Sequence, residues 1–314
     1  MAILSESTVA DRMMVGTRLF KAPRGLVWRA WTEPELLAQW WGPQGFANTF
    51  QTYDLRPGGE WLFVMRGPDG QDYKNRSNFT EIAAPERLKF DHASGPHFAV
   101  AATFAEEVGG TQVRFAGLFD SVEEWERVKG YAIEGNRQTL DRLEELVALQ
   151  VQSAFAFERT LNAPRDRVWK AWTKAERLKQ WWGPKGFGMR VASLDLRPEG
   201  LFHYAMTTPE GQEFWGKFVY RDIVAPQRLV LVVSFSDAEV GVTRHPLSAA
   251  WPLEVLNEIT LVEHEGRTTL TLRGVPIHAT EEECRTFEGG FESMRQGFNG
   301  TLDQLDDHLR NHPN

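Results

Sequence analysis

The feature that most constrains this chain is a duplicated octapeptide. Residues 39–46 read QWWGPQGF, and residues 180–187 read QWWGPKGF. The second copy follows the first at an offset of 141 residues, and the same offset aligns APRGLVWRAWT with APRDRVWKAWT and DLRPGG with DLRPEG. Solenoid units repeat every roughly 20 to 50 residues, so a period this long indicates two duplicated domains.

The length of the chain agrees with a duplication. At 314 residues it is about twice the usual domain length of roughly 150. We predict a first domain over residues 1–150, in which residues 1–11 form a flexible extension, and a second domain over residues 151–314. The junction, LEELVALQVQSAFAFERT, contains no Pro or Gly, so we expect the last helix of the first domain to run almost directly into the next strand.

Charge, hydropathy and cysteine content restrict the kinds of partner and the cellular compartment that we expect for this chain. A net charge of −8 without a long Lys/Arg run disfavours nucleic acid as a partner. No apolar run approaches the ~18 residues of a membrane span, so we expect no membrane insertion. The single cysteine, Cys284, excludes an internal disulfide and a cysteine-based zinc cluster. Because residues 1–11 also lack the features of a secretory signal, we predict a cytoplasmic location.

Each repeat begins with a strand followed by two short helices. The segment FAFERTLNAP alternates apolar and polar residues and stops at a proline, which predicts a first strand suited to a sheet edge. Thr32 with Glu35, and Thr173 with Glu176, have the spacing of a capping box, which predicts the start of the second helix at each threonine. The Gly-Pro pair after each tryptophan pair ends that helix.

The rest of each repeat reads as a sheet and a final helix. Turn signals about ten to fifteen residues apart predict six short antiparallel strands. NRQTLDRLEELV and FNGTLDQLDDHL then carry leucines at helical spacing. The predicted fold class is therefore α+β, with two tandem domains that each wrap a curved antiparallel sheet of about seven strands around a long C-terminal helix. The second repeat carries an insertion of 16 residues, placed at 234–252.

This order of elements, with the VWxAWT and WWGP motifs, resembles the helix-grip fold of the START-like (SRPBCC) superfamily. It is most similar to the domains named after the activator homologue of heat-shock protein 90 ATPase, once per repeat and over nearly the whole chain. The resemblance implies an internal apolar cavity that can take small hydrophobic ligands. The chaperone-binding N-terminal domain of the eukaryotic activator, with its NWHW-type motif, has no counterpart here. The first repeat departs from the family pattern at Asn136, where the second has Phe298.

Candidate ligand-binding residues are large or polar side chains that strand alternation and the resemblance place toward the interior. We interpret the repeated tryptophans first as scaffold over the open end of each sheet and second as ligand contacts. If Tyr73 and Phe79 point inward, Asn75 and Ser77 do so too, and His92 joins them. We therefore expect a somewhat polar cavity in the first domain and an apolar one in the second. The candidates are Trp31, Trp41, Trp61, Phe63, Asn75, Ser77 and His92 in the first domain, and Trp172, Trp182, Phe202, Tyr204, Phe218 and Phe298 in the second.

The sequence offers no residue pattern for catalysis. The eight histidines lack metal-binding spacing, RPGGE lacks the lysine of a phosphate-binding loop, and no nucleophile elbow occurs. We therefore predict no catalytic residue, no metal and no cofactor. Three functions stay open: binding or sequestration of a small hydrophobic molecule, a polyketide cyclase or aromatase-like activity, and a chaperone-associated role in which a protein partner contacts the 234–252 insertion.

Overall fold

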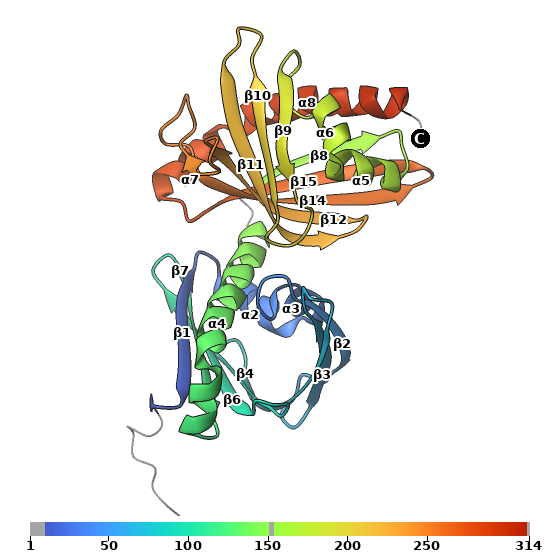
Figure 1. Cartoon of the computed structure of the whole chain (residues 1–314). Helices are drawn as coiled ribbons and strands as arrows, with labels where there is room; N and C mark the ends of the chain where they lie inside the picture. Colours follow the sequence, from blue (N-terminus) through green and yellow to red (C-terminus); the bar gives the residue numbers. More distant parts are fainter. Residues whose placement is uncertain (1–9, 151–153, 313–314) are drawn as a thin grey trace, which may run out of the picture. The chain divides into compact units, whose positions relative to one another are not determined.

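The computed structural model describes residues 10–150 and 154–312. The chain divides into two compact units, Met1–Val151 and Gln152–Asn314, and each described hydrophobic core lies within one unit. Figure 1 shows in each unit a curved antiparallel sheet, two short helices and a long helix, which confirms the predicted α+β fold class. Of the predicted N-terminal extension, residues 1–9 lie outside the described residues.

In its described residues, the first domain is a seven-stranded antiparallel sheet with the helices α2, α3 and α4. The strands are ordered β1-β7-β6-β5-β4-β3-β2, so β1 lies at one edge, as its sequence predicts. The long helix α4 packs against β1, β7 and both short helices. The elements are β1 (Met13–Phe20), α2 (Arg24–Thr32), α3 (Pro34–Trp40), β2 (Ala47–Tyr53), β3 (Glu60–Arg66), β4 (Asp72–Ala83), β5 (Arg87–His92), β6 (Phe98–Glu107), β7 (Gly110–Phe119) and α4 (Val122–Gln150).

The second domain repeats this plan with additions. Its strands follow the order β8-β15-β14-β12-β11-β10-β9, and the short β13 pairs with β12. The elements are β8 (Phe155–Leu161), α5 (Arg165–Thr173), α6 (Ala175–Trp181), β9 (Gly188–Leu194), β10 (Leu201–Thr207), β11 (Glu213–Val224), β12 (Arg228–Ser236), β13 (Val242–Thr243), β14 (Glu254–His264), β15 (Arg267–Ile277), α7 (Glu281–Gly289) and α8 (Phe291–Asn311).

The predicted capping boxes at the short helices are wrong. Helices α3 and α6 have Glu33 and Lys174 at their N-caps, and neither side chain makes a capping hydrogen bond. Thr32 instead ends α2, and its hydroxyl donates to the carbonyl of Trp28 at 2.8 Å. Thr173 does the same in α5. Each threonine is the last residue of the preceding helix, where its hydroxyl donates to the carbonyl four residues back, so the N-cap of the next helix falls one residue later, at Glu33 and at Lys174.

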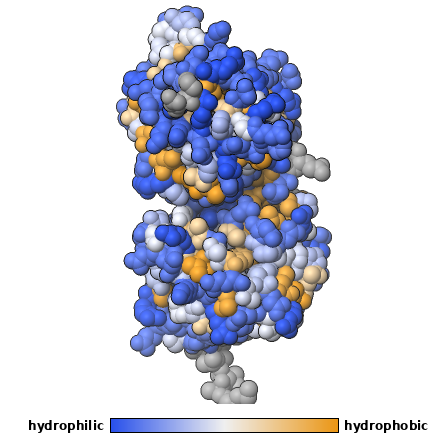
Figure 2. All heavy atoms as spheres, turned by 90° about the vertical axis from the view of Figure 1, so that its right-hand side faces the viewer, coloured by the Kyte–Doolittle hydropathy of each residue, from blue (hydrophilic) through white to orange (hydrophobic). Residues whose placement is uncertain are grey.

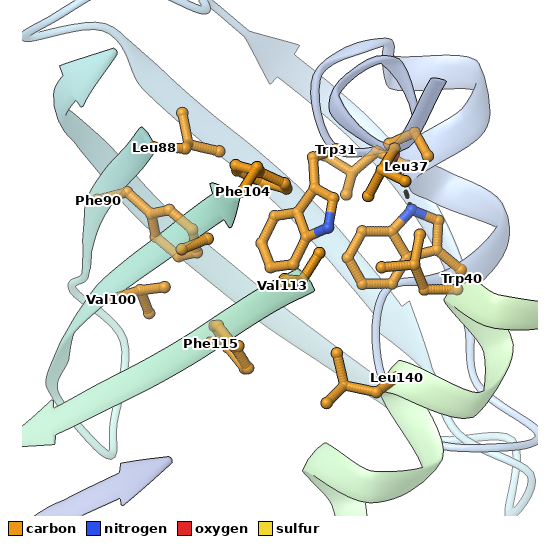
Figure 3. Close-up of a cluster of buried hydrophobic side chains, with 14 of the residues drawn as sticks. Trp31, Leu37, Trp40, Leu88, Phe90, Val100, Phe104, Val113, Phe115 and Leu140 are labelled. Atoms are coloured by element: carbon orange, nitrogen blue, oxygen red, sulfur yellow. Dashed lines mark hydrogen bonds between the residues drawn. The ribbon is translucent and has the colours of Figure 1, made fainter. Parts of the chain in front are cut away.

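The tryptophan motif builds the scaffold that joins the short helices to the sheet. The indole Nε1 of Trp40 donates to the carbonyl of Ala30 at 2.8 Å, and Trp181 bonds to Ala171 at 3.0 Å in the second domain. Figure 3 shows Trp40 beside Trp31, whose ring centroid lies 4.8 Å away. The buried indole N–H of Trp40, and that of Trp181, is therefore satisfied by the preceding helix, which gives the tryptophan the same structural role in both copies.

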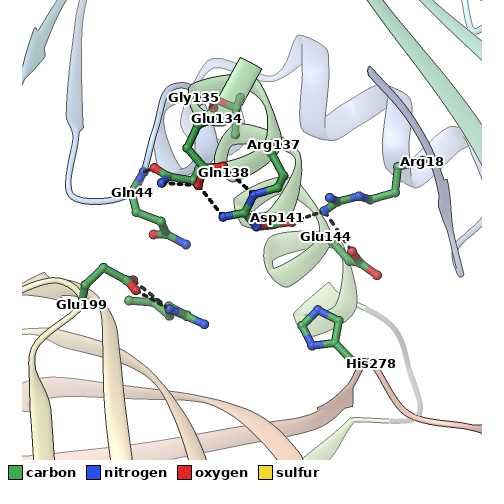
Figure 4. Close-up of polar contacts among 12 residues, drawn as sticks. Arg18, Gln44, Glu134, Gly135, Arg137, Gln138, Asp141, Glu144, Glu199 and His278 are labelled. Atoms are coloured by element: carbon green, nitrogen blue, oxygen red, sulfur yellow. Dashed lines mark hydrogen bonds and ion pairs between the residues drawn. The ribbon is translucent and has the colours of Figure 1, made fainter. Parts of the chain in front are cut away.

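A charged clasp fixes the long helix of each domain to its first strand. Arg18 on β1 contacts Asp141 at 2.5 Å and Glu144 at 3.2 Å on α4, as Figure 4 shows. In the second domain Arg159 on β8 contacts the matching carboxylates of α8, Asp303 at 2.5 Å and Asp306 at 3.1 Å. The same arrangement in both copies sets where each long helix crosses the edge strand.

Hydrophilic side chains predominate on the face shown in Figure 2, with apolar patches between them. Among the helices that the structure describes, none combines the length and the apolar character that a membrane crossing requires.

Candidate ligand-binding site

The predicted aromatic residues of the first domain form one packed cluster. Trp31, Trp61 and Phe63 are buried, and Trp41 is half-buried against them. The rings of Trp61 and Phe63 stack at 4.3 Å, and Trp41 lies 5.2 Å from Trp61. The indole nitrogens of Trp31 and Trp61 are buried without a hydrogen-bond partner in the described part of the chain. The cluster belongs to the hydrophobic core of the first domain. Its role as a ligand contact stays a prediction.

Two of the three predicted polar residues of this domain meet inside the sheet. Ser77 is fully buried, and its Oγ lies 3.4 Å from Nδ1 of His92, directly across the β4–β5 pair. Burial, and to a smaller extent the nearby His97, lowers the pKa of His92 to about 4. The side-chain amide of Asn75 is only partly buried and donates to the carbonyl of Tyr73 at 2.8 Å. The sheet therefore holds a neutral histidine and a serine as a pair.

Tyr73, whose inward orientation was the condition for placing Asn75 and Ser77 inside, lies on the inner face but is not buried. Tyr73 pairs with Met65 on the same alternation that places Ser77 opposite Trp61, yet 46% of its surface is exposed. Its ring packs against that of Phe46, with the ring centroids 5.9 Å apart. Strand β4 begins at Asp72, so Tyr73 lies near its start, where the inner face of the sheet is only partly covered.

The predicted residues of the second domain pack in the same way. Trp172 and Trp182 lie 5.4 Å apart, and Trp182 contacts Phe218 at 5.3 Å. Phe202 and Tyr204 stack at 4.8 Å on the same face of β10. Burial raises the pKa of Tyr204 to about 12, so its phenol is neutral at physiological pH.

The insertion of the second domain lies between β12 and β14 and folds back onto its own domain. Its predicted range, 234–252, begins inside β12 and includes β13. Trp251 packs on Phe287 of α7 at 5.4 Å, and Arg244 forms an ion pair with Glu283. Whether this segment also contacts a protein partner stays a prediction.

A small apolar pocket lies beside this insertion. It has a volume of about 120 Å³ and is lined by Tyr204 and by Trp251, Pro252 and Leu253, among others. The phenol of Tyr204 lies over Gly216, where an added Cβ would come within 2.6 Å of the hydroxyl oxygen. Because ligand pockets usually measure about 300 to 1,000 Å³, this one suits only a very small molecule or part of one.

A larger groove lies in the first domain between β1 and α4. Its volume is about 540 Å³, within the usual range for small-molecule sites. None of the predicted site residues lines it. The lining residues are Met13, Met14, Val15, Gly16, Thr17 and Arg18 of β1, and Trp125, Ile133, Asn136, Arg137 and Leu140 of α4.

The groove has an apolar floor, and both apolar and polar side chains line its exposed edge. Met14, Trp125 and Leu140 are buried at its base, whereas Val15 and Ile133 are 45% and 57% exposed. The amide oxygen of Asn136 is buried without a hydrogen-bond partner among the described residues. A Cβ on Gly16 would lie 2.4 Å from the Asn136 amide nitrogen, so the glycine makes room for this amide.

The second domain fills the same place with aromatic rings. Positions matching Met14, Gly16 and Asn136 hold Phe155, Phe157 and Phe298. The ring of Phe298 stacks on that of Phe155 at 5.7 Å and lies 5.9 Å from that of Phe157. The groove could have been found from the sequence by comparing the two repeats at these three positions together, because each change from phenylalanine removes volume from one shared space.

Several solved structures are similar to this chain. A Nitrosomonas europaea protein is 27% identical over 44% of this chain and 95% of its own, with a TM-score of 0.42. A Mycobacterium smegmatis protein is 29% identical over 44% of this chain and 92% of its own, with a TM-score of 0.41. The di-domain ARO/CYC BexL from the BE-7585A biosynthetic pathway is 16% identical over 95% of this chain and 98% of its own, with a TM-score of 0.51. No curated protein matches the chain.

The likeness to the di-domain structure extends over both repeats and shows the tandem helix-grip fold. The family profile described as Activator of Hsp90 ATPase homolog 1-like protein matches residues 21–148 and, a second time, residues 162–310. These matches confirm the resemblance seen in the sequence motifs. The chain therefore belongs to the family of Activator of Hsp90 ATPase homolog 1-like proteins and carries two tandem copies of its domain.

Proposed function

We propose that the first domain binds a small, mainly apolar molecule in the groove between β1 and α4. The observation that carries this proposal is the contrast between the two copies: a groove of about 540 Å³ in the first domain occupies the position of the phenylalanine cluster in the second. A helix-grip family with an apolar interior supports the same class of ligand. The second domain then serves as a filled, structural copy.

The polar atoms around the groove define the ligand further. Arg18 is held by Asp141 and Glu144, and Arg137 is held by Glu134 and Asp141, so both guanidinium groups already have carboxylate partners. The buried amide oxygen of Asn136 lacks a donor in the described part of the chain. A neutral molecule with an apolar body and one hydroxyl or N–H group would satisfy this oxygen and cover the buried floor.

Native mass spectrometry of the freshly purified chain tests the proposal. We expect a co-purified small molecule, or uptake of an environment-sensitive apolar dye, in the unmodified protein. Asn136→Phe copies the residue of the second domain and should reduce dye binding at least tenfold, because the ring fills the groove. The matched control, Phe298→Asn, leaves the groove intact and should retain that binding.

Absence of binding in the unmodified chain, or undiminished binding by Asn136→Phe, would contradict this assignment. The cyclase-like and chaperone-associated functions, the ligand contacts of the aromatic clusters and the cytoplasmic location stay predictions.

A further inference from the structure

The small pocket beside the insertion of the second domain is built from features that the first domain lacks. At the position of Tyr204 the first domain has Phe63, and at that of Gly216 it has Asn75. The insertion that supplies Trp251 is also missing from the first domain. The phenylalanine rings that fill the second domain at the place of the groove do not line this pocket. The pocket is therefore a separate feature of the second domain.

A glycine leaves the space that the phenol of Tyr204 occupies. Tyr204 on β10 pairs directly with Gly216 on the neighbouring strand β11 (Figure 1). A Cβ at position 216 would lie 2.6 Å from the hydroxyl oxygen, too close for any other residue to be accommodated without a shift. The hydroxyl donates to no acceptor within residues 10–150 and 154–312. Tyr204 therefore brings a hydrogen-bond donor without an acceptor of its own to the wall of the pocket.

Another wall of the pocket is the indole of Trp251, which its own domain holds in place. The ring packs on that of Phe287 in α7, with the ring centroids 5.4 Å apart. The carbonyl of Trp251 accepts a hydrogen bond from Arg244 at 3.3 Å. A Cβ on Gly290, between α7 and α8, would lie 2.9 Å from the indole ring, so this glycine makes room for the tryptophan. The wall that the insertion adds is thus a packed part of the domain.

The volume and the polarity of the pocket restrict its ligand. The volume of about 120 Å³ is close to that of a cavity of roughly 150 Å³ that holds benzene. None of the residues that line it carries a charge, and most of them are apolar or aromatic. A charged ligand would lose its hydration there without gaining an ion pair. Because burial keeps the phenol of Tyr204 neutral at physiological pH, its hydroxyl favours a ligand with a hydrogen-bond acceptor.

We propose that this pocket binds an uncharged molecule about one ring in size, whose carbonyl or ether oxygen accepts a hydrogen bond from Tyr204. The oxygen satisfies the free donor and fixes the orientation of the molecule. The apolar body of the molecule packs against Trp251 and the neighbouring side chains of the pocket. This site lies in the second domain and does not depend on the ligand proposed for the groove of the first.

Titration of the full chain with acetophenone, followed by NMR of methyl-labelled methionines, tests the proposal. Acetophenone combines one aromatic ring with one carbonyl oxygen. Met206 lines this pocket, whereas Met13 and Met14 line the groove of the first domain, so each site has its own reporter. We expect acetophenone to shift the Met206 resonance, whatever happens at the groove.

Two variants and a second probe test the role of each wall. Tyr204→Phe introduces the residue that the first domain buries at the matching position, Phe63, and removes only the hydroxyl. It should weaken acetophenone binding roughly three- to tenfold, as expected for one hydrogen bond, and leave binding of the near-isosteric α-methylstyrene, which lacks the oxygen, unchanged. Trp251→Ala removes a wall and should weaken both probes at least tenfold. The control Leu247→Ala, in the same insertion but 89% exposed, should weaken neither.

The proposal is overturned if acetophenone leaves the Met206 resonance unchanged, if Tyr204→Phe weakens both probes equally, or if Trp251→Ala binds as well as the unmodified chain. Shifts of Met13 and Met14 alone would support the groove of the first domain and reject this pocket. A shift of Met206 alone would support this pocket without supporting the groove, so the two assignments fail independently.

Discussion

At His92, burial decides the protonation state of a side chain. The ring is 9% exposed, lies opposite Ser77 and packs on Phe98 at 4.8 Å. Its pKa of about 4 in the folded chain is below the value of about 6.5 that an exposed histidine has. The unfolded chain therefore takes up this proton first as pH falls. The stability that neutral His92 provides is complete above pH 6.5 and is lost as pH falls toward 4.

This shift predicts a pH dependence that one substitution removes. Between pH 7 and pH 5 the protonation of His92 in the unfolded state should cost the first domain roughly 2 kcal/mol. His92→Val introduces the residue that the second domain has at the matching position, Val233. Between pH 7 and pH 5 the variant should lose about 2 kcal/mol less unfolding free energy than the unmodified chain. Urea unfolding at both pH values measures the difference. An NMR titration midpoint of His92 near 6.5 would show that the ring is not buried as described.

At the scale of elements, the clasp between the edge strand and the long helix recurs in both domains. Side-chain exposure of Arg18 is 23% and that of Asp141 is 25%, so solvent screens this pair only in part. The arginine also lies beside the groove and orients α4 over β1. The clasp therefore contributes to the shape of the proposed site as well as to stability.

Arg18→Met keeps the apolar stem of the side chain and removes its charge. We expect the first domain to lose about 1 kcal/mol of stability, because a partly exposed pair of this kind contributes little more. Arg159→Met should have a similar effect on the second domain. Urea unfolding at low salt and in 1 M NaCl measures both losses, and screening should shrink them. A loss that is independent of salt would assign the effect to packing instead of charge.

At the scale of the whole molecule, two separate cores define two folding units. The buried clusters of the two domains share no residue. Each unit has more than 140 residues, enough to bury a core by itself. We predict that Met1–Val151 and Gln152–Asn314 fold when expressed separately. The amide NMR spectrum of each piece should overlay on its half of the full-chain spectrum, apart from residues near the cut. A collapsed spectrum of either piece would show that its core depends on the other half.

The sequence alone determined the architecture of this protein. Duplicated motifs, strand alternation and leucine spacing predicted two domains and the order of elements, because these patterns report periodicities that local backbone geometry imposes. The helix-grip family was implied by the resemblance of the VWxAWT and WWGP motifs. Local reasoning failed where the neighbouring elements decided the position or the exposure of a side chain. The hydroxyl of Thr32 bonds to its own helix instead of capping the next one. Tyr73 lies on the inner face beyond the reach of the cluster that would cover it.

Only the tertiary structure decided where space remains between the packed side chains. The groove depends on Gly16 and Asn136, which are 120 residues apart and meet where α4 crosses β1. A groove is a difference between the volume that several distant side chains fill and the volume that the surrounding elements enclose. A sequence pattern describes the side chains of one segment at a time. The groove exists only once folding has brought distant segments together.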